Sequence, residues 1–173
     1  QEDSSELTDE EWTAIQHQID ETLDAFVAFR TQEGQALQQM FNTKLDEVID
    51  LLTQVEQFEK GRVDKIRERL EQNLNLLAEK TKQQIDANRL EQEMIYYLEK
   101  LDITEEKVRL TNHVRYFRET MDAEGTGVGK KLGFIAQEMG REINTLGSKS
   151  NQSEMQIIVV KMKDILEQIK EQV

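Results

Sequence analysis

Residues 12–55 read WTAIQHQIDETLDAFVAFRTQEGQALQQMFNTKLDEVIDLLTQV, and this stretch decides the fold class. Its apolar side chains recur every three or four residues, which places them on one face of an α-helix. The pattern predicts a helix of about 45 residues, roughly 65–70 Å long. Thr8-x-x-Glu11, a capping box, begins it. Nothing else covers this face, so it must pack on a partner helix. The face consists of Trp12, Ile15, Ile19, Leu23, Phe26, Leu37, Phe41, Leu45, Val48, Leu52 and Val55.

The rest of the chain repeats the helical pattern between recognisable start and stop signals. Gly61 is the expected break before a second helix, and Asp102-x-x-Glu105 is a second capping box that opens a fourth. Three glycines within residues 125–129 separate the fourth helix from the fifth, which is expected to end at Gly147 in a left-handed cap. The sequence therefore predicts an all-α protein of about six helices.

We interpret the first two helical segments as a long antiparallel hairpin, because the apolar face of the first needs a partner. This coiled-coil-like hairpin occupies residues 1–82. A smaller helical bundle follows as a C-terminal domain of residues 83–173, with Asn151-x-x-Glu154 capping its last helix.

Composition excludes several classes of protein. The 173 residues include no Cys, so disulfides and thiolate zinc sites are excluded, and no Pro and only 8 Gly, which is unusual for sandwiches and barrels. The net charge of -13 is uneven. Residues 1–60 hold 15 acidic and 3 basic side chains, whereas residues 61–173 hold 20 and 19. Any contact with a polyanion is therefore expected in the second part of the chain.

The glycine-rich stretch is followed by Lys130 and Lys131, which invites comparison with a phosphate-binding loop. The comparison is weak, because a P-loop needs a preceding strand and four residues between its first Gly and the Gly-Lys-Ser/Thr. A hinge is the better interpretation. Both lysines still lie in the first turn of a helix, whose free amides would add to an anion site.

Two other groups of polar residues have helical spacing. Glu106, Arg109 and His113 share one face of a helix that also borders an apolar stripe. His113 is either a half-buried structural residue or a general base or metal ligand. Glu138 and Glu142 lie four residues apart, and this repulsive pair needs a cation. Arg141 would supply it in a purely structural role, and a divalent metal is the alternative.

Several blocks resemble the YicC family of endoribonucleases, and they occur in family order over nearly the whole chain. Phe134-Ile135-x-Gln137-Glu138-Met139-x-Arg141-Glu142-x-Asn144-Thr145 is the most specific block, and Ser148-Lys149-Ser150 follows it. The others are Arg30-x-x-Glu33-Gly34, Asn88-Arg89-Leu90-Glu91-Gln92-Glu93, Asp102-Ile103-x-Glu105-Glu106 with Arg109-Leu110 and His113, and Val128-Gly129-Lys130-Lys131-Leu132.

The resemblance implies a bacterial cytoplasmic protein that cleaves RNA internally with a divalent cation, Mn²⁺ or Mg²⁺. It also implies a ring-like homo-oligomer, a hexamer in the intact protein, with no membrane or DNA partner. Family members carry a β-containing N-terminal domain ahead of the helices. That domain is absent here, so we expect the chain to be the helical C-terminal portion of such a protein, and the isolated chain to be inactive if it needs the missing domain.

The resemblance also assigns candidate site residues by position. His113, Glu138 and Glu142 are the catalytic candidates. The metal candidates are Glu93, Asp102, Glu106, Glu138 and Glu142, and the RNA-binding candidates are Arg89, Arg109, Lys130, Lys131, Arg141 and Lys149. Two alternatives to the nuclease remain open, namely a helical oligomerisation module and an adaptor that binds RNA without cutting it.

Overall fold

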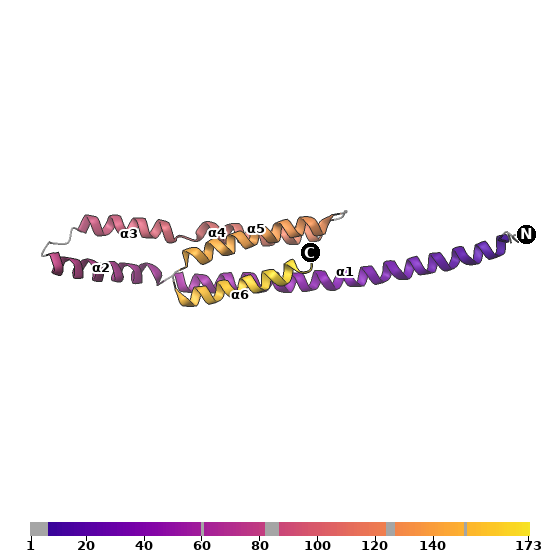
Figure 1. Cartoon of the computed structure of the whole chain (residues 1–173), viewed down its shortest axis with the longest axis horizontal. Coiled ribbons are helices and arrows are strands. Elements are labelled where there is room, and N and C mark those ends of the chain that lie inside the picture. The colour runs from indigo at the N-terminus through magenta and orange to yellow at the C-terminus, as the bar shows by residue number, and fades with distance from the viewer. Residues whose placement is uncertain (1–6, 60, 82–86, 124–126, 151) are drawn as a thin grey trace, which may run out of the picture. The chain divides into compact units, whose positions relative to one another are not determined.

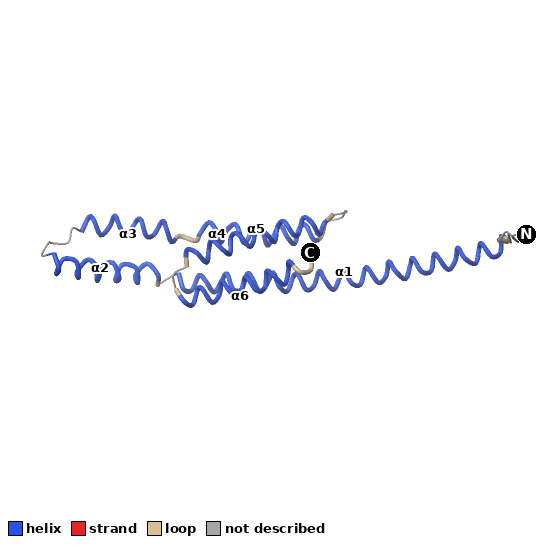
Figure 2. The backbone as a smooth tube through the Cα atoms, viewed as in Figure 1, coloured by secondary structure: helices blue, strands red, loops and turns tan. Residues whose placement is uncertain are grey.

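The computed structural model describes residues 7–59, 61–81, 87–123, 127–150 and 152–173. The described residues form helices joined by short turns, with no strand among them, which confirms the all-α prediction (Figures 1 and 2). None of these helices is both long and apolar enough to span a bilayer. The helices are α1 (Asp9–Glu59), α2 (Arg62–Thr81), α3 (Ala87–Leu101), α4 (Thr104–Met121), α5 (Val128–Lys149) and α6 (Ser153–Lys170).

The chain divides into two units, residues 1–40 and 41–173. In the first unit, the predicted capping box begins α1, since the Thr8 amide donates to Glu11 Oε2 at 2.9 Å and the Glu11 amide donates to Thr8 Oγ1 at 3.3 Å. Every described residue from Leu7 to Ala36 is exposed, including the apolar face that starts at Trp12. This half of α1 therefore presents an uncovered apolar face.

The core of the second unit lies among the C-terminal half of α1 and helices α4, α5 and α6. The apolar face of α1 becomes buried from Phe41 onward, and the Phe41 ring meets the Phe117 ring of α4 edge-on, with 5.5 Å between ring centroids. α5 packs against both α4 and α6, and Figure 1 shows α6 running beside α1. The side chains with no exposed surface include Leu45, Val48, Leu110, Phe117, Met139, Ile143, Leu146, Met155, Met162 and Ile169.

Helix α2 packs chiefly on α3, as the two roughly parallel ribbons in Figure 1 show. We expected α2 to pair with α1, and its packing on α3 corrects that prediction. The physical reason is that the second half of α1 buries its apolar face against other helices, so the weaker apolar face of α2 is left for α3. The boundary predicted between residues 82 and 83, Asn151 of the last cap and residues 125 and 126 of the glycine-rich stretch lie outside the described residues.

Gly147 does not end α5, which continues to Lys149, and the left-handed cap predicted there is wrong. The described glycine with a left-handed backbone is Gly127, whose φ is 79° just before α5 begins. Gly147 is needed for packing instead, because a Cβ built on it would lie 2.9 Å from Val159 Cγ1 on α6. The residue thus allows α5 and α6 to approach closely.

Replacing Gly147 with alanine is expected to lower the free energy of unfolding by about 1–2 kcal/mol, because the new methyl group overpacks the contact with Val159. Urea denaturation measures this change. Gly129→Ala is the matched control, since a Cβ there meets nothing within 4 Å and helix propensity favours alanine by about 0.5–1 kcal/mol. Adding Val159→Ala to Gly147→Ala should remove the steric part of the loss. Equal effects at Gly147 and Gly129 would contradict the packing role.

Candidate functional site

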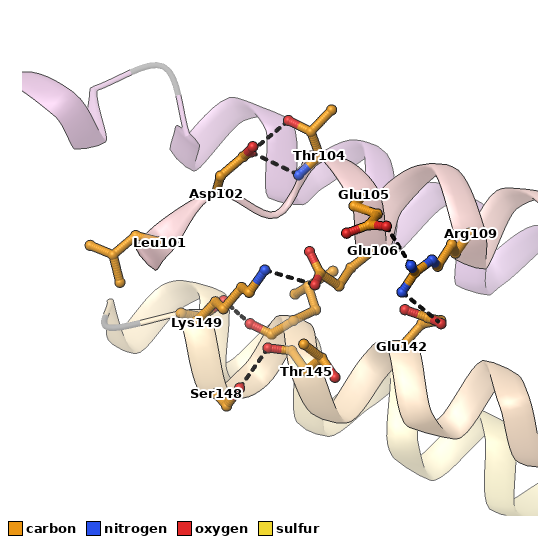
Figure 3. A network of polar contacts seen from close by, with 12 residues as sticks. Leu101, Asp102, Thr104, Glu105, Glu106, Arg109, Glu142, Thr145, Ser148 and Lys149 are labelled. Carbon is orange, nitrogen blue, oxygen red and sulfur yellow. Dashed lines mark hydrogen bonds and ion pairs between the residues drawn. The ribbon is translucent and has the colours of Figure 1, made fainter. Parts of the chain in front are cut away.

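Helices α4 and α5 run antiparallel and share two ion pairs that involve predicted site residues (Figure 3). Lys149 Nζ lies 2.8 Å from Glu106 Oε1, and Arg109 Nη1 lies 4.0 Å from Glu142 Oε1. The antiparallel register then puts His113, one turn beyond Arg109 on α4, level with Glu138, one turn before Glu142 on α5. We call the six residues Glu106, Arg109, His113, Glu138, Glu142 and Lys149 the α4–α5 polar row.

The polar row is buried at one end and open at the other. The Glu106 side chain is 5% exposed, and its Oε2 has no hydrogen-bond partner among the described residues. Glu142 is 12% exposed, whereas Glu138 is 42% exposed. His113 is half-buried. The open end could therefore meet a large polyanion, while the buried end holds charge in a low-dielectric setting.

The repulsion between Glu138 and Glu142 is relieved by two different arginines. Arg141 Nη1 lies 2.9 Å from Glu138 Oε1, as the structural interpretation of the sequence predicted. Arg109, which reaches across from α4, pairs with Glu142 and also with Glu105 on its own helix. The cation for Glu142 was not foreseen, because the sequence does not reveal which side chains face each other across two helices.

Asp102 lies just before α4, whose N-cap is Ile103, and it binds the first residue of the helix. Its Oδ1 accepts hydrogen bonds from the Thr104 hydroxyl at 2.7 Å and the Thr104 amide at 2.9 Å, which Figure 3 shows. These bonds lower the pKa of the Asp102 carboxyl, with a smaller contribution from the Lys149 charge. The predicted capping box with Glu105 needs correction, since Glu105 instead pairs with Arg109. Asp102 thus has a structural role that accounts for its contacts.

Replacing Asp102 with alanine is expected to lower the free energy of unfolding by about 1 kcal/mol at pH 7, because it removes the two hydrogen bonds that Thr104 donates to it. The pKa of Asp102 is lower in the folded chain, so its contribution is complete above the ordinary value of 3.8 and disappears as pH falls through the folded value. Urea denaturation at pH 7 and at about pH 3 should show that the unchanged chain and Asp102→Ala differ less in their free energy of unfolding in acid. Asp102→Asn keeps an acceptor and should lose less. A stability difference that grows in acid would contradict this role of the ionised Asp102 carboxylate.

Arg62 is a buried residue that sequence reasoning missed. It is 5% exposed and donates from Nη1 to the Leu101 carbonyl at 3.1 Å and from Nη2 to the Lys149 carbonyl. These carbonyls belong to the last residues of α3 and α5, where helix dipoles favour a cation. Arg62 therefore joins two helix ends and fixes the backbone that carries Lys149. Its neighbours in sequence are mostly exposed, so the local pattern gives no sign that Arg62 is buried.

The remaining site candidates lie away from the polar row or at its margin. Arg89 and Glu93 are exposed on α3. Lys130 and Lys131 are exposed in the first turn of α5, at the opposite end of that helix from Lys149, and the Lys131 ammonium lies 4.8 Å from the centre of the Tyr116 ring. Lys130 and Lys131 could contact a phosphate backbone beyond the open end of the row.

The five carboxylates predicted as metal ligands do not fit a ready-made metal site. In the part of the chain that the structure describes, no three His, Asp or Glu side chains form a group that could hold a metal ion. Glu106, Glu138 and Glu142 each form an ion pair with a Lys or Arg side chain. Asp102 accepts a hydrogen bond from Thr104. We therefore derive no chemical step through a metal, and the metal requirement stays a prediction.

Comparison with known proteins links the chain to one family. The family model described as "Endoribonuclease YicC-like, C-terminal" matches residues 55–173. A protein of Clostridioides difficile (strain 630) named "Probable endoribonuclease YicC" is 32% identical over 172 residues, which cover 99% of this chain and 58% of the relative. A Haemophilus influenzae protein (strain ATCC 51907 / DSM 11121 / KW20 / Rd) of the same name is 34% identical over 155 residues, covering 90% and 52%. The chain thus spans a little over half the length of these relatives.

Proposed function

The chain belongs to the YicC-like endoribonuclease family through its C-terminal domain, and from this membership we propose that its helices take part in the internal cleavage of RNA. The observation that supports this most is the α4–α5 polar row. Six residues singled out from the sequence come from these two helices. Two cross-helix ion pairs join four of them, and the antiparallel register places His113 and Glu138 one turn further along. Such a concentration of acidic, basic and imidazole groups is more than packing two helices requires.

The polar row contains the groups that phosphodiester cleavage needs. Whether a 2′-hydroxyl or a water attacks, a base must take its proton and an acid must protonate the leaving oxygen. His113 offers an imidazole for either role, and Glu138 or Glu142 would serve as its partner. Arg109 is 53% exposed beside Glu142 and would neutralise charge on the phosphorus oxygens. Lys130, Lys131, Arg141 and Arg89 would hold the RNA backbone, without sequence preference.

The proposal is tested with end-labelled RNA incubated with this chain, with the full-length C. difficile relative beside it, in Mn²⁺ and in a chelator. We expect internal cleavage by the full-length relative, and by the chain as well if its helices suffice without the N-terminal domain. Products should be lost in the chelator if the predicted metal is required. Binding that weakens steeply with salt but yields no products would favour the adaptor instead. Neither binding nor cleavage by the chain would favour the oligomerisation module.

Assembly into a homo-oligomer is the second part of the proposal, supported by the uncovered apolar face of α1. Trp12, Ile19, Leu23 and Phe26 are about half exposed on the N-terminal half of that helix, at the spacing of a helix–helix contact. Exposed apolar stripes of this kind mark protein interfaces. Light scattering of the chain should give a mass several times 20.2 kDa, with six copies as the family resemblance implies. A monomer at all concentrations would contradict this part.

A further inference from the structure

Phe134 is an exposed aromatic residue on α5 whose ring is open to a ligand. The residue is 58% exposed. Among the described residues, no other aromatic ring and no cation lies against the Phe134 ring. Tyr116 on α4 is also exposed, at 44%, but the Lys131 ammonium already lies 4.8 Å from the centre of its ring. The Phe134 ring is therefore the free aromatic surface in this region.

The surroundings of Phe134 on its own helix are cationic. Lys130 and Lys131 precede it by four and three residues, the spacings that make side chains neighbours on a helix surface. Residues 128–137 include no acidic side chain. The exposed aromatic residues of α1 lie instead within residues 1–60, which hold 15 acidic and 3 basic side chains. Phe134 thus places an exposed ring where a polyanion is attracted rather than repelled.

Phe134 also lies next to the open end of the α4–α5 polar row. Glu138 of the row is one turn further along α5, about 6 Å along the helix axis. The contact between Lys131 and Tyr116 confirms that α5 stays beside α4 at this level, since Tyr116 is three residues beyond His113. A phosphodiester held at His113 and Glu138 would therefore have an adjacent base within reach of the Phe134 ring.

We propose that Phe134 is a stacking platform for one unpaired base of a single-stranded RNA, an inference that rests on the proposed function and names the class of RNA that it takes. Every base has a π-face, so stacking on an aromatic ring needs no particular sequence. Lys130 and Lys131 would contact the phosphates beside the stacked base. In a duplex the bases are stacked on one another, so an exposed ring cannot reach them. The platform therefore selects single strands over duplexes.

A second copy of the chain is the other occupant that an exposed phenylalanine could have, and the charges around Phe134 disfavour it. The cores of protein interfaces are depleted in charged residues. Phe134, however, is followed on the same face of α5 by Glu138 and Arg141 and preceded by Lys130 and Lys131. A protein that covered the ring would also have to desolvate these charges. A stacked base covers the ring alone and leaves the lysines to the phosphates.

The test is a titration of the chain into a short fluorescein-labelled single strand of RNA in a chelator, followed by fluorescence anisotropy, with the same sequence as a duplex beside it. Phe134→Ala should weaken binding of the single strand at least about fivefold, the effect of one stacked base, and leave duplex binding unchanged. Phe134→Leu should lose as much, because leucine is apolar but has no π-face, whereas Phe134→Trp should keep the affinity. Ile157→Ala is the matched control, since Ile157 is 57% exposed on α6, outside the polar row, and should bind as the unchanged chain does.

Unchanged affinity in Phe134→Ala, full affinity in Phe134→Leu, equal binding of single strand and duplex, or no binding by the unchanged chain would each overturn the inference. Light scattering of Phe134→Ala should give the mass of the unchanged chain, and a lower mass would overturn it in favour of a second copy on the ring. Binding is measured without cleavage, so the two proposals fail separately. Single-strand binding through Phe134 by a chain that cuts no RNA would support the platform and contradict the nuclease. Cleavage by a chain whose Phe134→Ala variant binds and cuts equally well would do the reverse.

Discussion

Replacing Lys149 with methionine is expected to lower the free energy of unfolding by about 3 kcal/mol. The substitution leaves Glu106 with an uncompensated charge on a side chain that is only 5% exposed. Breaking a buried pair in this way costs about 3–5 kcal/mol, and because Lys149 is itself 28% exposed we expect the lower end. Urea denaturation of both proteins at pH 7 measures the change.

The control for this prediction is Lys161→Met on α6, where the lysine is exposed and the expected change is within about 0.5 kcal/mol. A double variant, Glu106→Leu with Lys149→Met, removes both charges and should recover most of the lost stability, because the apolar pair needs no compensation. If Lys149→Met is as stable as Lys161→Met, the Glu106 carboxylate does not depend on Lys149, and the buried end of the polar row is wrongly described.

The second large effect is expected on cleavage. Alanine at His113, Glu138 or Glu142 should slow RNA cleavage at least about 100-fold, the usual contribution of a positioned acid or base. The fold should survive, since Arg109 keeps its pair with Glu105 when Glu142 is removed and, at 53% exposed, remains in contact with water. Single-turnover rates on one labelled RNA measure the loss, and circular dichroism checks the helices.

Glu119→Ala is the matched control on α4, because Glu119 is an exposed carboxylate paired with Arg115 outside the polar row. Its cleavage rate should equal that of the unchanged chain. Wild-type rates in all three site variants would remove the polar row from the reaction, whatever the family resemblance implies.

Most of the helical architecture could be predicted, because helical periodicity and capping are local. The steps of three and four residues that define the apolar face of α1 run from Trp12 to Phe26 and, after an interruption at Arg30 and Glu33, from Leu37 to Val55. The Thr8 cap and the break at Gly61 lie next to the elements they begin or separate. Pairing between helices is not local. The packing of α2 on α3 could not be predicted from local patterns. Nor could the role of Gly147, which allows close contact with Val159 and does not form a helix cap.

The same limit applies to the candidate site. Helical spacing placed Glu106, Arg109 and His113 on one helix face and paired Glu138 with Glu142, and the family motif added Lys149. Their alignment across α4 and α5 follows from tertiary packing. Arg62 could not be found from sequence, because its two carbonyl acceptors lie 39 and 87 residues away in the chain.

The most direct measurement compares cleavage of one end-labelled RNA by the unchanged chain and by a His113→Ala, Glu142→Ala double variant whose helicity and oligomeric mass match it. We predict internal products from the unchanged chain and none above background from the double variant, prepared in the same way. Equal products from both would contradict the assignment of RNA cleavage to the α4–α5 polar row, and so would the absence of products from the unchanged chain.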